Sequence, residues 1–376
     1  MKPARHFDHI VLGTGSMGAA TCWELARRGE SVLGIDRFNV PHDRGSHGGE
    51  TRIIRKAYYE HPDYIPLLQA AYAGWEELEA ASNQQHFFRT GLLYAGREHS
   101  SILQGVVQSA KQYGIELDRL AWSDAPSARF NLPADYTILF EPDAGFIRVD
   151  TALKSLMDQA RIHGAEFLTN TPVVSWTEKD DGITVQTTSE TFTCDKLIIT
   201  AGAWTSSLLP SMADKLTVTR QVLAWYDVGE EHAYGLGDFP CWLIAEPGLP
   251  GPYYGFPSIE QGKNEMKVAY HHRGPIADPD LIAEKVSEQE TEALNRFVKK
   301  TFKGVSSAPI RTAVCMYVNS PDDHFIIDRI GRVSFACGFS GHGFKFVPAI
   351  GSALADLSIK ATTDLPIGFL SSDRFD

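Results

Sequence analysis

The segment from Phe7 to Asp36 constrains the fold of this chain more than any other. The apolar run from His9 to Leu12 ends at a glycine-rich turn, Gly13 to Gly18, and a helical pattern follows. A second apolar run, Ser31 to Ile35, then leads to Asp36. This order of strand, turn, helix, strand and acid is the dinucleotide-binding fingerprint in its required context.

Each glycine of this turn has its own task. Gly13 makes the tight turn, Gly15 lets the backbone approach a pyrophosphate, and Gly18 lets helix and strand pack closely. The pyrophosphate lies at the helix N-terminus, where free N–H groups and the helix dipole favour an anion. Asp36 follows Gly18 by 18 residues, close to the spacing of a carboxylate that binds an adenosine ribose. The fingerprint alone does not distinguish NAD from FAD.

A second glycine-rich stretch, Gly338 to Lys345, favours FAD. It follows a predicted strand, precedes a predicted helix and places three glycines within six residues. A NAD-binding domain needs only one such turn, whereas two turns far apart in the sequence suit a larger ligand held from both ends. Lys345 would place a cation near a substrate carboxylate or the flavin pyrimidine edge. The alternative is a surface lysine that caps a turn.

Bulk composition excludes several classes of protein. A net charge of −12 argues against nucleic-acid binding, which needs a basic patch or stripe. No apolar run approaches the roughly 18 residues of a membrane span, and no signal-peptide segment precedes the fingerprint. The five scattered cysteines predict neither a disulfide framework nor a metal site. We therefore expect a cytoplasmic monomer without nucleic-acid or membrane partners.

The predicted elements describe an α/β fold with an α+β second domain. We expect helices at Tyr64 to Ala81, Ile102 to Tyr113, Leu153 to His163, Glu288 to Thr301 and Ala349 to Ile359. Predicted strands are Phe87 to Ala95 with a bend at Gly91, Val173 to Trp176, Ile183 to Thr187, Thr191 to Cys194, Leu197 to Gly202, Gln221 to Tyr226, Tyr253 to Pro257, Glu265 to His271 and Val333 to Cys337.

The order of these elements predicts two domains. Residues 1–85, 145–214 and 318–376 would form a Rossmann-type FAD-binding domain. Residues 86–144 and 215–317 would form an inserted substrate domain with a mixed or antiparallel sheet. These boundaries follow the change from long apolar runs to short alternating strands.

Three cations are candidates for chemistry. Arg52 and Arg55 are three residues apart, so they share a face if the segment is helical and lie on opposite faces if it is extended. An arginine fork matches a carboxylate, although a structural pair of arginines is the alternative. Lys267 alternates with apolar neighbours in a predicted strand, and a lysine on the inward face of a strand is unusual unless it is used.

Other candidates carry less independent weight. His47 alone is more often structural than catalytic, and Tyr254, His271 and Tyr317 are aromatic or polar candidates. Cys315 lies in an apolar run and by itself reads as a buried, inert thiol. It precedes Gly338 by 23 residues, so it could approach the same cofactor from the other side.

Several segments together resemble the monomeric sarcosine oxidase family, which includes N-methyltryptophan oxidase and the L-pipecolate and sarcosine oxidases. The resemblance is carried by Gly13 to Gly18, Gly45 to His47, Thr51 to Arg55, Tyr253 to Pro257, Val314 to Tyr317, Pro321 to Asp328 and Gly338 to Lys345. Met266 to His272 and Arg55 to Tyr58 look most like the pipecolate branch. One departure is Gly48, where the family usually has a histidine.

The resemblance implies the roles of the site residues. FAD would be joined covalently through a thioether from Cys315 to its 8α-methyl group. Lys267 would assist oxygen reduction on one flavin face, with Arg52 close by. On the other face Arg55 and Lys345 would hold the substrate carboxylate, with Tyr254, His271 and Tyr317 around the amine.

The expected cofactor-binding residues combine both glycine-rich segments with the resemblance. They are Gly13, Gly15, Ser16, Met17, Gly18, Asp36, Arg37, Ser46, His47, Arg52, Val173, Gly202, Trp204, Cys315, Met316, Gly338, Gly341, His342, Gly343, Phe344 and Lys345.

The predicted activity is oxidation of a secondary amino acid to an imine, with reduction of O2 to H2O2. The small-molecule partners would be this amino acid and O2. One alternative is a dehydrogenase that reduces a quinone or carrier, and another is a flavin-binding protein without turnover.

Overall fold

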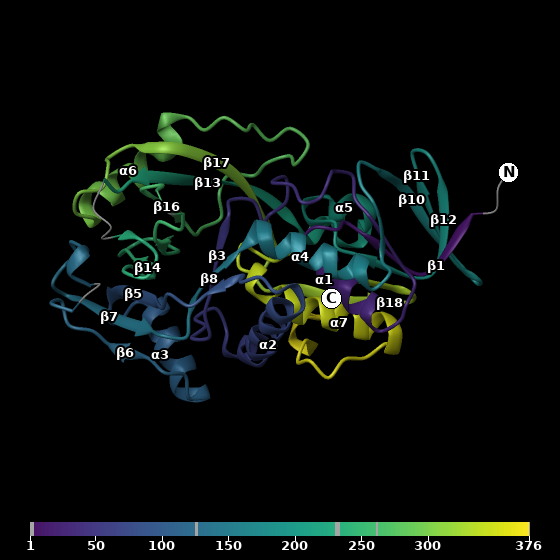
Figure 1. The fold of residues 1–376 in the computed structure, drawn as a ribbon, viewed down its shortest axis with the longest axis horizontal. Coiled ribbons are helices and arrows are strands. Elements are labelled where there is room, and N and C mark those ends of the chain that lie inside the picture. Colours follow the sequence, from purple (N-terminus) through teal and green to yellow (C-terminus); the bar gives the residue numbers. More distant parts are fainter. Residues whose placement is uncertain (1–3, 125–126, 230–233, 261, 376) are drawn as a thin grey trace.

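The chain folds around two large sheets, which lie at opposite ends of the view in Figure 1. The computed structural model describes residues 4–124, 127–229, 234–260 and 262–375. The first eight-stranded sheet contains β1 (Arg5–Leu12), β2 (Val32–Ile35), β9 (Glu166–Leu168), β10 (Val173–Lys179), β11 (Gly182–Thr187), β12 (Thr191–Ile199), β18 (Ile326–Ile330) and β19 (Val333–Cys337). The second contains β5 (Leu92–Arg97), β6 (Asp118–Arg119), β7 (Tyr136–Glu141), β13 (Thr217–Asp227), β14 (Cys241–Ala245), β15 (Tyr253–Gly255), β16 (Glu265–Tyr270) and β17 (Pro309–Asn319). A small third sheet joins β3 (Thr51–Ile54), β8 (Gly145–Arg148) and β4 (Phe87–Phe88).

Parallel strands form the centre of the first sheet. β1 pairs in parallel with β2 and β12, and β12 pairs in parallel with β19. Ile10, Val11 and Leu12 have no exposed surface, as expected for a parallel strand that is covered on both faces. The predicted order of strand, turn, helix and strand is confirmed.

Helices between the two sheets form the main core (Figure 1). They are α1 (Ser16–Arg27), α2 (Ile65–Ser82), α4 (Val149–Ile162) and α7 (Val347–Lys360). A Cβ atom at Gly351 would lie 2.7 Å from the Cβ of Ala20, so glycine lets α7 approach α1. This close approach places the start of α7 beside the start of α1. The turns before these two helices border the cavity described below.

The second sheet is mixed, as predicted. Its long pair β13 and β17 is antiparallel, whereas β14 pairs in parallel with β5. Leu294, Phe297 and Val298 of α6 (Glu288–Thr301) pack against this sheet, and α3 (Ser101–Tyr113) packs on β5. The short helix α5 (Thr205–Leu208) follows β12.

Three predicted strands differ from the structure. The segment from Phe87 to Ala95 is not one bent strand, because β4 and β5 belong to different sheets on either side of Gly91. Gly91 has φ +70°, and a Cβ atom there would lie 2.1 Å from the ring of Phe140, so the chain changes sheet at a residue that has to be glycine. The predicted strands at Thr191 and Leu197 are one strand, β12.

The division into two domains stays a prediction, which the strand membership supports. Every strand of the first sheet lies in residues 1–85, 145–214 or 318–376. The second sheet takes its strands from residues 86–144 and 215–317, apart from the last two residues of β17.

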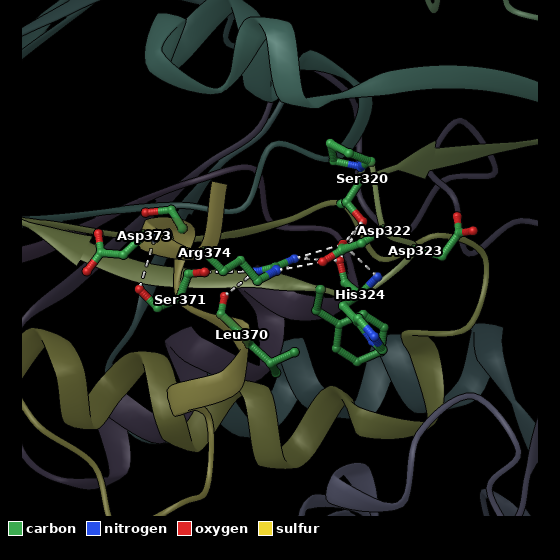
Figure 2. Close-up of polar contacts among 12 residues, drawn as sticks. Ser320, Asp322, Asp323, His324, Leu370, Ser371, Asp373 and Arg374 are labelled. Carbon is green, nitrogen blue, oxygen red and sulfur yellow. Dashed lines mark hydrogen bonds and ion pairs between the residues drawn. The ribbon is translucent and has the colours of Figure 1, made fainter. Parts of the chain in front are cut away.

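Arg374 fastens the C-terminal end of the described chain to the loop before β18 (Figure 2). Its Nε and Nη2 atoms donate to the two carboxylate oxygens of Asp322 at 2.8 and 3.1 Å. Nη1 donates to the carbonyl oxygens of Leu370 and Ser371 at 2.9 and 2.8 Å. The same loop offers the carbonyl oxygen of Asp323 to the Nε2 atom of His342 at 2.9 Å, so the C-terminus supports a loop behind the cavity.

We predict that Arg374→Ala lowers the free energy of unfolding by about 1–2 kcal/mol, because it removes a two-pronged ion pair and hydrogen bonds to the carbonyl oxygens of Leu370, Ser371 and His324. Urea denaturation followed by circular dichroism measures the change. Arg296→Ala is the control, because Arg296 and its partner Glu292 have side chains 67% and 64% exposed, and such pairs contribute little. Equal losses in the two variants would contradict the prediction.

Candidate active site

The turn between β1 and α1 lets a ligand approach the backbone. Gly13 has φ +88°, and a Cβ atom there would lie 2.7 Å from the Cα of Ala201. A Cβ atom at Gly18 would lie 2.0 Å from the carbonyl oxygen of Gly13. No side chain caps the start of α1 at Gly15. Its first N–H groups and the helix dipole therefore favour an anion here.

Asp36 is buried at the end of β2. Its Oδ2 accepts a hydrogen bond from the backbone N–H of Thr14 at 2.8 Å, and its Oδ1 accepts one from Phe38 at 2.9 Å. Burial acts to raise the pKa of Asp36, but hydrogen bonds from His42 and these N–H groups outweigh it and lower that pKa. The carboxylate is thus ionised and fixed beside the glycine-rich turn.

Arg37 and Trp204 close the same end of the cavity. The Arg37 guanidinium lies 5.0 Å from the ring centroids of both Phe38 and Trp204. Asp280, from the segment between β16 and α6, forms an ion pair with Arg37 Nη1 at 2.9 Å and accepts a hydrogen bond from Trp204 Nε1 at 2.9 Å. A residue of the second, inserted part of the chain therefore reaches the predicted nucleotide site.

A cavity of about 410 Å³ runs from this turn to the loop between β19 and α7. The predicted site residues that line it are Gly13, Gly15, Ser16, Met17, Asp36, Arg37, Ser46, His47, Arg52, Arg55, Val173, Gly202, Trp204, Tyr254, His271, Tyr317, Gly338, Gly341, His342, Gly343, Phe344 and Lys345. Gly18, Lys267, Cys315 and Met316 lie outside the lining. Both glycine-rich segments thus border one cavity, as the sequence predicts.

Arg52 contacts the predicted flavin-linking cysteine. Its Nη2 atom lies 3.7 Å from the Cys315 Sγ atom and donates to the carbonyl oxygens of Ser46 and Gly48 at 2.9 and 2.6 Å. Burial raises the pKa of the Cys315 thiol, while Arg52 and Lys267 act in the opposite direction. The thiol is therefore buried next to positive charge.

Lys267 is a buried cation on β16. Its Nζ atom donates to the carbonyl oxygens of Gly49 and Thr51 at 2.5 and 2.9 Å and to Thr51 Oγ1 at 2.8 Å. The ammonium also lies 4.3 Å from the Phe256 ring centroid. Burial and the neighbouring Arg52 hold the pKa of Lys267 well below its usual value. The prediction that this lysine points inward is confirmed.

Arg55 is paired with a carboxylate of its own chain. Its Nη2 atom donates to both oxygens of Glu60 at 2.6 Å, and Nη1 donates to the carbonyl oxygen of Ala57 at 2.9 Å. Burial acts to raise the pKa of Glu60, but the charge of Arg55 outweighs it and lowers that pKa to about 2. β3 is extended through Arg52, so the two arginines point to different sides, and this decides the alternative that their spacing leaves open.

Lys345 and His342 form the opposite wall of this end of the cavity. Lys345 Nζ donates to the carbonyl oxygen of His342 at 2.7 Å, and burial together with Arg55 lowers the pKa of Lys345 to about 7. His342 Nδ1 lies 2.5 Å from the Tyr58 hydroxyl. Burial lowers the pKa of His342 to about 3, so this ring is neutral.

His271 and Tyr317 meet from neighbouring parts of the second sheet. His271 Nδ1 lies 3.2 Å from the Tyr317 hydroxyl. Burial lowers the pKa of His271 to about 4. Tyr254 lines the same part of the cavity. This group is therefore neutral and polar at pH 7, between the cations of the two walls.

The glycine at position 48 has a local cause. A Cβ atom at Gly48 would lie 2.7 Å from the carbonyl oxygen of Asp43, so this loop has no space for a histidine there. His47 instead bonds the carbonyl oxygen of His42 through Nε2 at 2.9 Å, and burial lowers its pKa to about 4. His47 faces Gly15, where a Cβ atom would lie 3.4 Å from its ring.

Glu60, Tyr58, His42 and Asp280 are site residues that the sequence did not single out. Glu60 follows Arg55 by five residues in a stretch without hydrophobic periodicity. Only its opposite charge could have indicated that it pairs with Arg55. Tyr58 carries the His342 contact, and Asp280 lies 243 residues from Arg37 in the sequence. Local patterns hold no information about such pairs.

The residues present fit a dinucleotide cofactor. Glycine-rich turns border the cavity at both ends, the start of α1 has no side-chain cap, and the ionised carboxylate of Asp36 lies beside the first turn, as binding of a ribose requires. Buried cations and neutral polar groups line the remaining part. The fold and the cavity together define a dinucleotide-dependent oxidoreductase.

Comparison with known proteins specifies the class further. The chain matches the family described as FAD dependent oxidoreductase over residues 8–357. It is 35% identical to the monomeric sarcosine oxidase of Streptomyces avermitilis over 98% of this chain and 97% of that protein. It is 33% identical to the N-methyl-L-tryptophan oxidase of Yersinia pestis over 98% of this chain and 99% of that protein.

A solved structure shares the fold. The open form of NikD, an unusual amino acid oxidase, has a TM-score of 0.87 at 23% identity and covers 98% of this chain and 97% of that one. The chain therefore belongs to the family of FAD-dependent oxidoreductases that contains the monomeric sarcosine oxidases and the N-methyl-L-tryptophan oxidases. The predicted family, the α/β fold class and the FAD cofactor are confirmed.

The described residues offer neither a membrane-spanning helix nor a metal-binding cluster. No helix among residues 4–124, 127–229, 234–260 and 262–375 is long and apolar enough to cross a membrane. The same part of the chain contains no group of three or more His, Cys, Asp or Glu residues that could hold a metal ion.

We predict that Gly18→Ala abolishes stable FAD binding, because its Cβ atom would meet the Gly13 carbonyl oxygen and push the turn away from the ligand. The ratio of flavin to protein absorbance in the purified protein measures the loss. Gly368→Ala is a matched control, because this exposed glycine has no positive φ and a Cβ atom there meets nothing within 4 Å. A Gly18→Ala protein with full flavin content would show that the turn is not part of the cofactor site.

Proposed function

We propose that this enzyme oxidises an N-methylated or cyclic secondary amino acid, sarcosine-like or pipecolate-like, to an imine and reduces O2 to H2O2. The observation that carries the proposal is the meeting of two cations around one buried ring. The Arg55 guanidinium lies 4.3 Å, and the Lys345 ammonium 5.1 Å, from the Tyr58 ring centroid. Two cations at one end of the cavity suit a substrate carboxylate.

The names of the relatives support the same substrate class. Sarcosine and N-methyl-L-tryptophan are both N-methyl amino acids. Each has a carboxylate and a secondary amine separated by one carbon atom. The cation pair and the neutral group of His271, Tyr254 and Tyr317 border the same cavity, which supports a substrate of this kind.

FAD, when bound, supplies the redox step, in which a hydride leaves the carbon next to the amine nitrogen and two electrons pass on to O2. The chain has to present the amine in its neutral form, because a protonated amine does not release a hydride. Arg55 and Lys345 disfavour an additional positive charge on the substrate amine, and burial of the amine acts in the same direction. Because His271 is neutral, one of its ring nitrogens can accept a hydrogen bond from the amine.

Glu60 sets a condition on substrate binding. It already occupies the Arg55 Nη2 atom with both carboxylate oxygens. A substrate carboxylate therefore has to displace Glu60 or share Arg55 with it. Lys345, whose pKa is about 7, donates one of its three possible hydrogen bonds to the carbonyl oxygen of His342, so it can also donate to a substrate carboxylate.

An H2O2-coupled screen of sarcosine, pipecolate, proline, other N-methyl amino acids and glycated amines tests the activity. Anaerobic flavin bleaching without H2O2 formation in air would indicate a dehydrogenase that uses a quinone or carrier. No bleaching by any amine would indicate a flavin-binding protein without turnover. The monomeric state and the cytoplasmic location stay predictions.

We further propose that Cys315 forms a thioether with the 8α-methyl group of FAD. Its burial beside Arg52 and Lys267 supports this role, because nearby cations favour the thiolate. Forming the C–S bond removes the thiol proton and one hydrogen of the methyl group, and the two electrons pass to O2.

We predict that acid precipitation of the wild-type protein leaves the yellow colour in the pellet, whereas Cys315→Ser releases it to the supernatant. Cys337→Ser is the control, because Cys337 is a buried cysteine of β19 that lines the cavity away from Arg52 and Lys267. Yellow supernatant from the wild-type protein would exclude the covalent bond and leave FAD binding intact.

We predict that Lys267→Met slows reoxidation of the reduced enzyme by O2 about 10²–10³-fold, by analogy with the loss of one fixed donor to a developing negative charge. Anaerobic reduction by substrate should change much less. Stopped-flow measurement of the two half-reactions distinguishes them. Equal losses in both would show that the substitution disturbs the fold rather than oxygen reduction.

We predict that Arg55→Ala and Lys345→Ala each weaken binding of the amino acid tens-fold or more, since a charge-assisted hydrogen bond contributes about 1.5–3 kcal/mol. Arg55→Lys should restore binding only in part, because a point charge does not reproduce the fork. Titration of the flavin spectrum with substrate under anaerobic conditions measures binding. If wild type and variants oxidise the decarboxylated amine as well as the amino acid, the substrate is an amine and the clamp is refuted.

A further inference from the structure

Glu50 has a strained backbone at a point that the proposed mechanism does not explain. It lies directly before β3 with φ +67°, in the left-handed region that a glutamate rarely adopts. Gly49 before it also has a positive φ, +95°. Strain of this kind persists where the surrounding contacts determine the conformation, and it is frequent at functional sites.

Arg311 and Trp225 hold the Glu50 side chain. Arg311 Nη2 lies 2.9 Å from Glu50 Oε1 and donates to Oε2 at 3.1 Å, and Trp225 Nε1 donates to Oε2 at 3.2 Å. The Arg311 guanidinium stacks on the Trp225 ring at 3.8 Å. The Glu50 carbonyl oxygen accepts from the N–H of Val149 at 2.8 Å. Both the carboxylate and the peptide group of Glu50 are therefore fixed.

The neighbours of Glu50 bind Lys267. Gly49 and Thr51 supply three acceptors, two carbonyl oxygens and one hydroxyl, at 2.5, 2.9 and 2.8 Å from Lys267 Nζ. An ammonium group has three donors, so this short segment satisfies all of them. Trp225 pairs with Lys267 across β13 and β16, so the residue that holds Glu50 is also a strand partner of the lysine.

Charge links the same residues. Four charged or titratable groups influence the protonation of Lys267. They are Arg52 of β3, Glu50 directly before β3, Cys315 of β17 and Cys241 of β14. Burial and Arg52 lower the pKa of Lys267, whereas Glu50 raises it. Glu50 is the carboxylate among these groups.

We propose that Glu50 is a positioning residue for Lys267: it aligns the three acceptors of the ammonium group through its strained turn, and its carboxylate, held beside the strand partner Trp225, favours the charged form of that group. The inference rests on the proposed role of Lys267 in oxygen reduction. Reduction of O2 to H2O2 takes two electrons from the reduced cofactor and two protons. A fixed cation beside O2 stabilises the negative charge that develops as the electrons arrive.

The sign of the pH effect follows from the charges. The Lys267 cation is lost as pH rises through its pKa, so oxygen reduction slows with increasing pH. Because Glu50 raises this pKa, loss of its charge moves the decline to lower pH. A variant that keeps a carboxylate at position 50 keeps the decline near its wild-type pH.

The test compares Glu50→Asp with Glu50→Asn. Aspartate and asparagine both tolerate a positive φ and have nearly the same shape, so the pair differs mainly in charge. Each holoenzyme is reduced anaerobically with dithionite and mixed with oxygenated buffer over a range of pH, and flavin absorbance gives the rate of reoxidation. This design needs no knowledge of the substrate.

We expect Glu50→Asn to reoxidise about tenfold more slowly than Glu50→Asp at neutral pH, with its pH midpoint lower by about one unit. Amide hydrogen exchange of the peptide spanning residues 45–55 should be faster in Glu50→Asn, which reports the positioning independently of activity. Equal rates, equal midpoints and equal exchange in the two variants would overturn the inference.

Two further variants separate the possible causes. Glu265→Gln removes the other carboxylate that Arg311 binds, at 2.6 Å, and should leave reoxidation unchanged; a loss equal to that of Glu50→Asn would assign the effect to Arg311 and overturn the inference. Lys267→Met is measured in parallel. If it reoxidises at the wild-type rate, the proposed oxygen role fails; if it is slow while the Asp and Asn variants agree, only the role of Glu50 fails.

Discussion

Burial of positive charge is the constraint on which this cavity depends. Lys267, Arg55 and Lys345 are 3%, 3% and 6% exposed, and a buried cation without partners would lose its proton or destabilise the fold. The three are accommodated differently. Arg55 has a carboxylate partner in Glu60, Lys267 has the backbone around Glu50, and Lys345 donates to the carbonyl oxygen of His342. This difference explains why the pKa values of the two lysines are lowered while Arg55 stays charged.

The segment around β3 organises the site because it is extended and lies between the two large sheets. β3 pairs with β8 along one edge in the small third sheet. Its side chains and the backbone next to it can therefore contact the cavity. Successive residues of an extended segment point to opposite sides. Arg52 therefore reaches Cys315, the backbone before it holds Lys267, and Arg55 reaches the opposite wall with Glu60. One short stretch thus contributes to both predicted faces of the flavin.

Local pattern was enough to predict the elements whose signal lies within the element itself. The strand, glycine turn and helix of β1 and α1 are of this kind, and so are α6, which has a capping box at Ser287, and the inward lysine of β16. The parallel pairing of β14 with β5 could not be predicted, since it joins Cys241 to Leu92 across most of the second domain. Pairing of distant strands is fixed by packing rather than by propensity.

The same limit applies to the site. Sequence placed Lys267 on a strand, but its acceptors at Gly49 and Thr51 are more than 200 residues away. The spacing of Arg52 and Arg55 left two arrangements open, and the extended backbone of β3 decided between them. Glu60 was not predicted because its role depends on the burial of Arg55, and a local sequence pattern does not indicate that burial.

The charges around Arg55 also indicate how a substrate carboxylate would be accommodated. With Glu60 ionised and Arg55 charged, this pair is neutral, and Lys345 with a pKa of about 7 is only partly protonated at neutral pH. A carboxylate that enters beside Lys345 adds negative charge and so raises the pKa of that lysine. The lysine then becomes fully protonated, and two cations face two carboxylates. In the proposed complex the amine has to lose a proton and Lys345 has to gain one, so a single proton transfer from amine to lysine would meet both requirements.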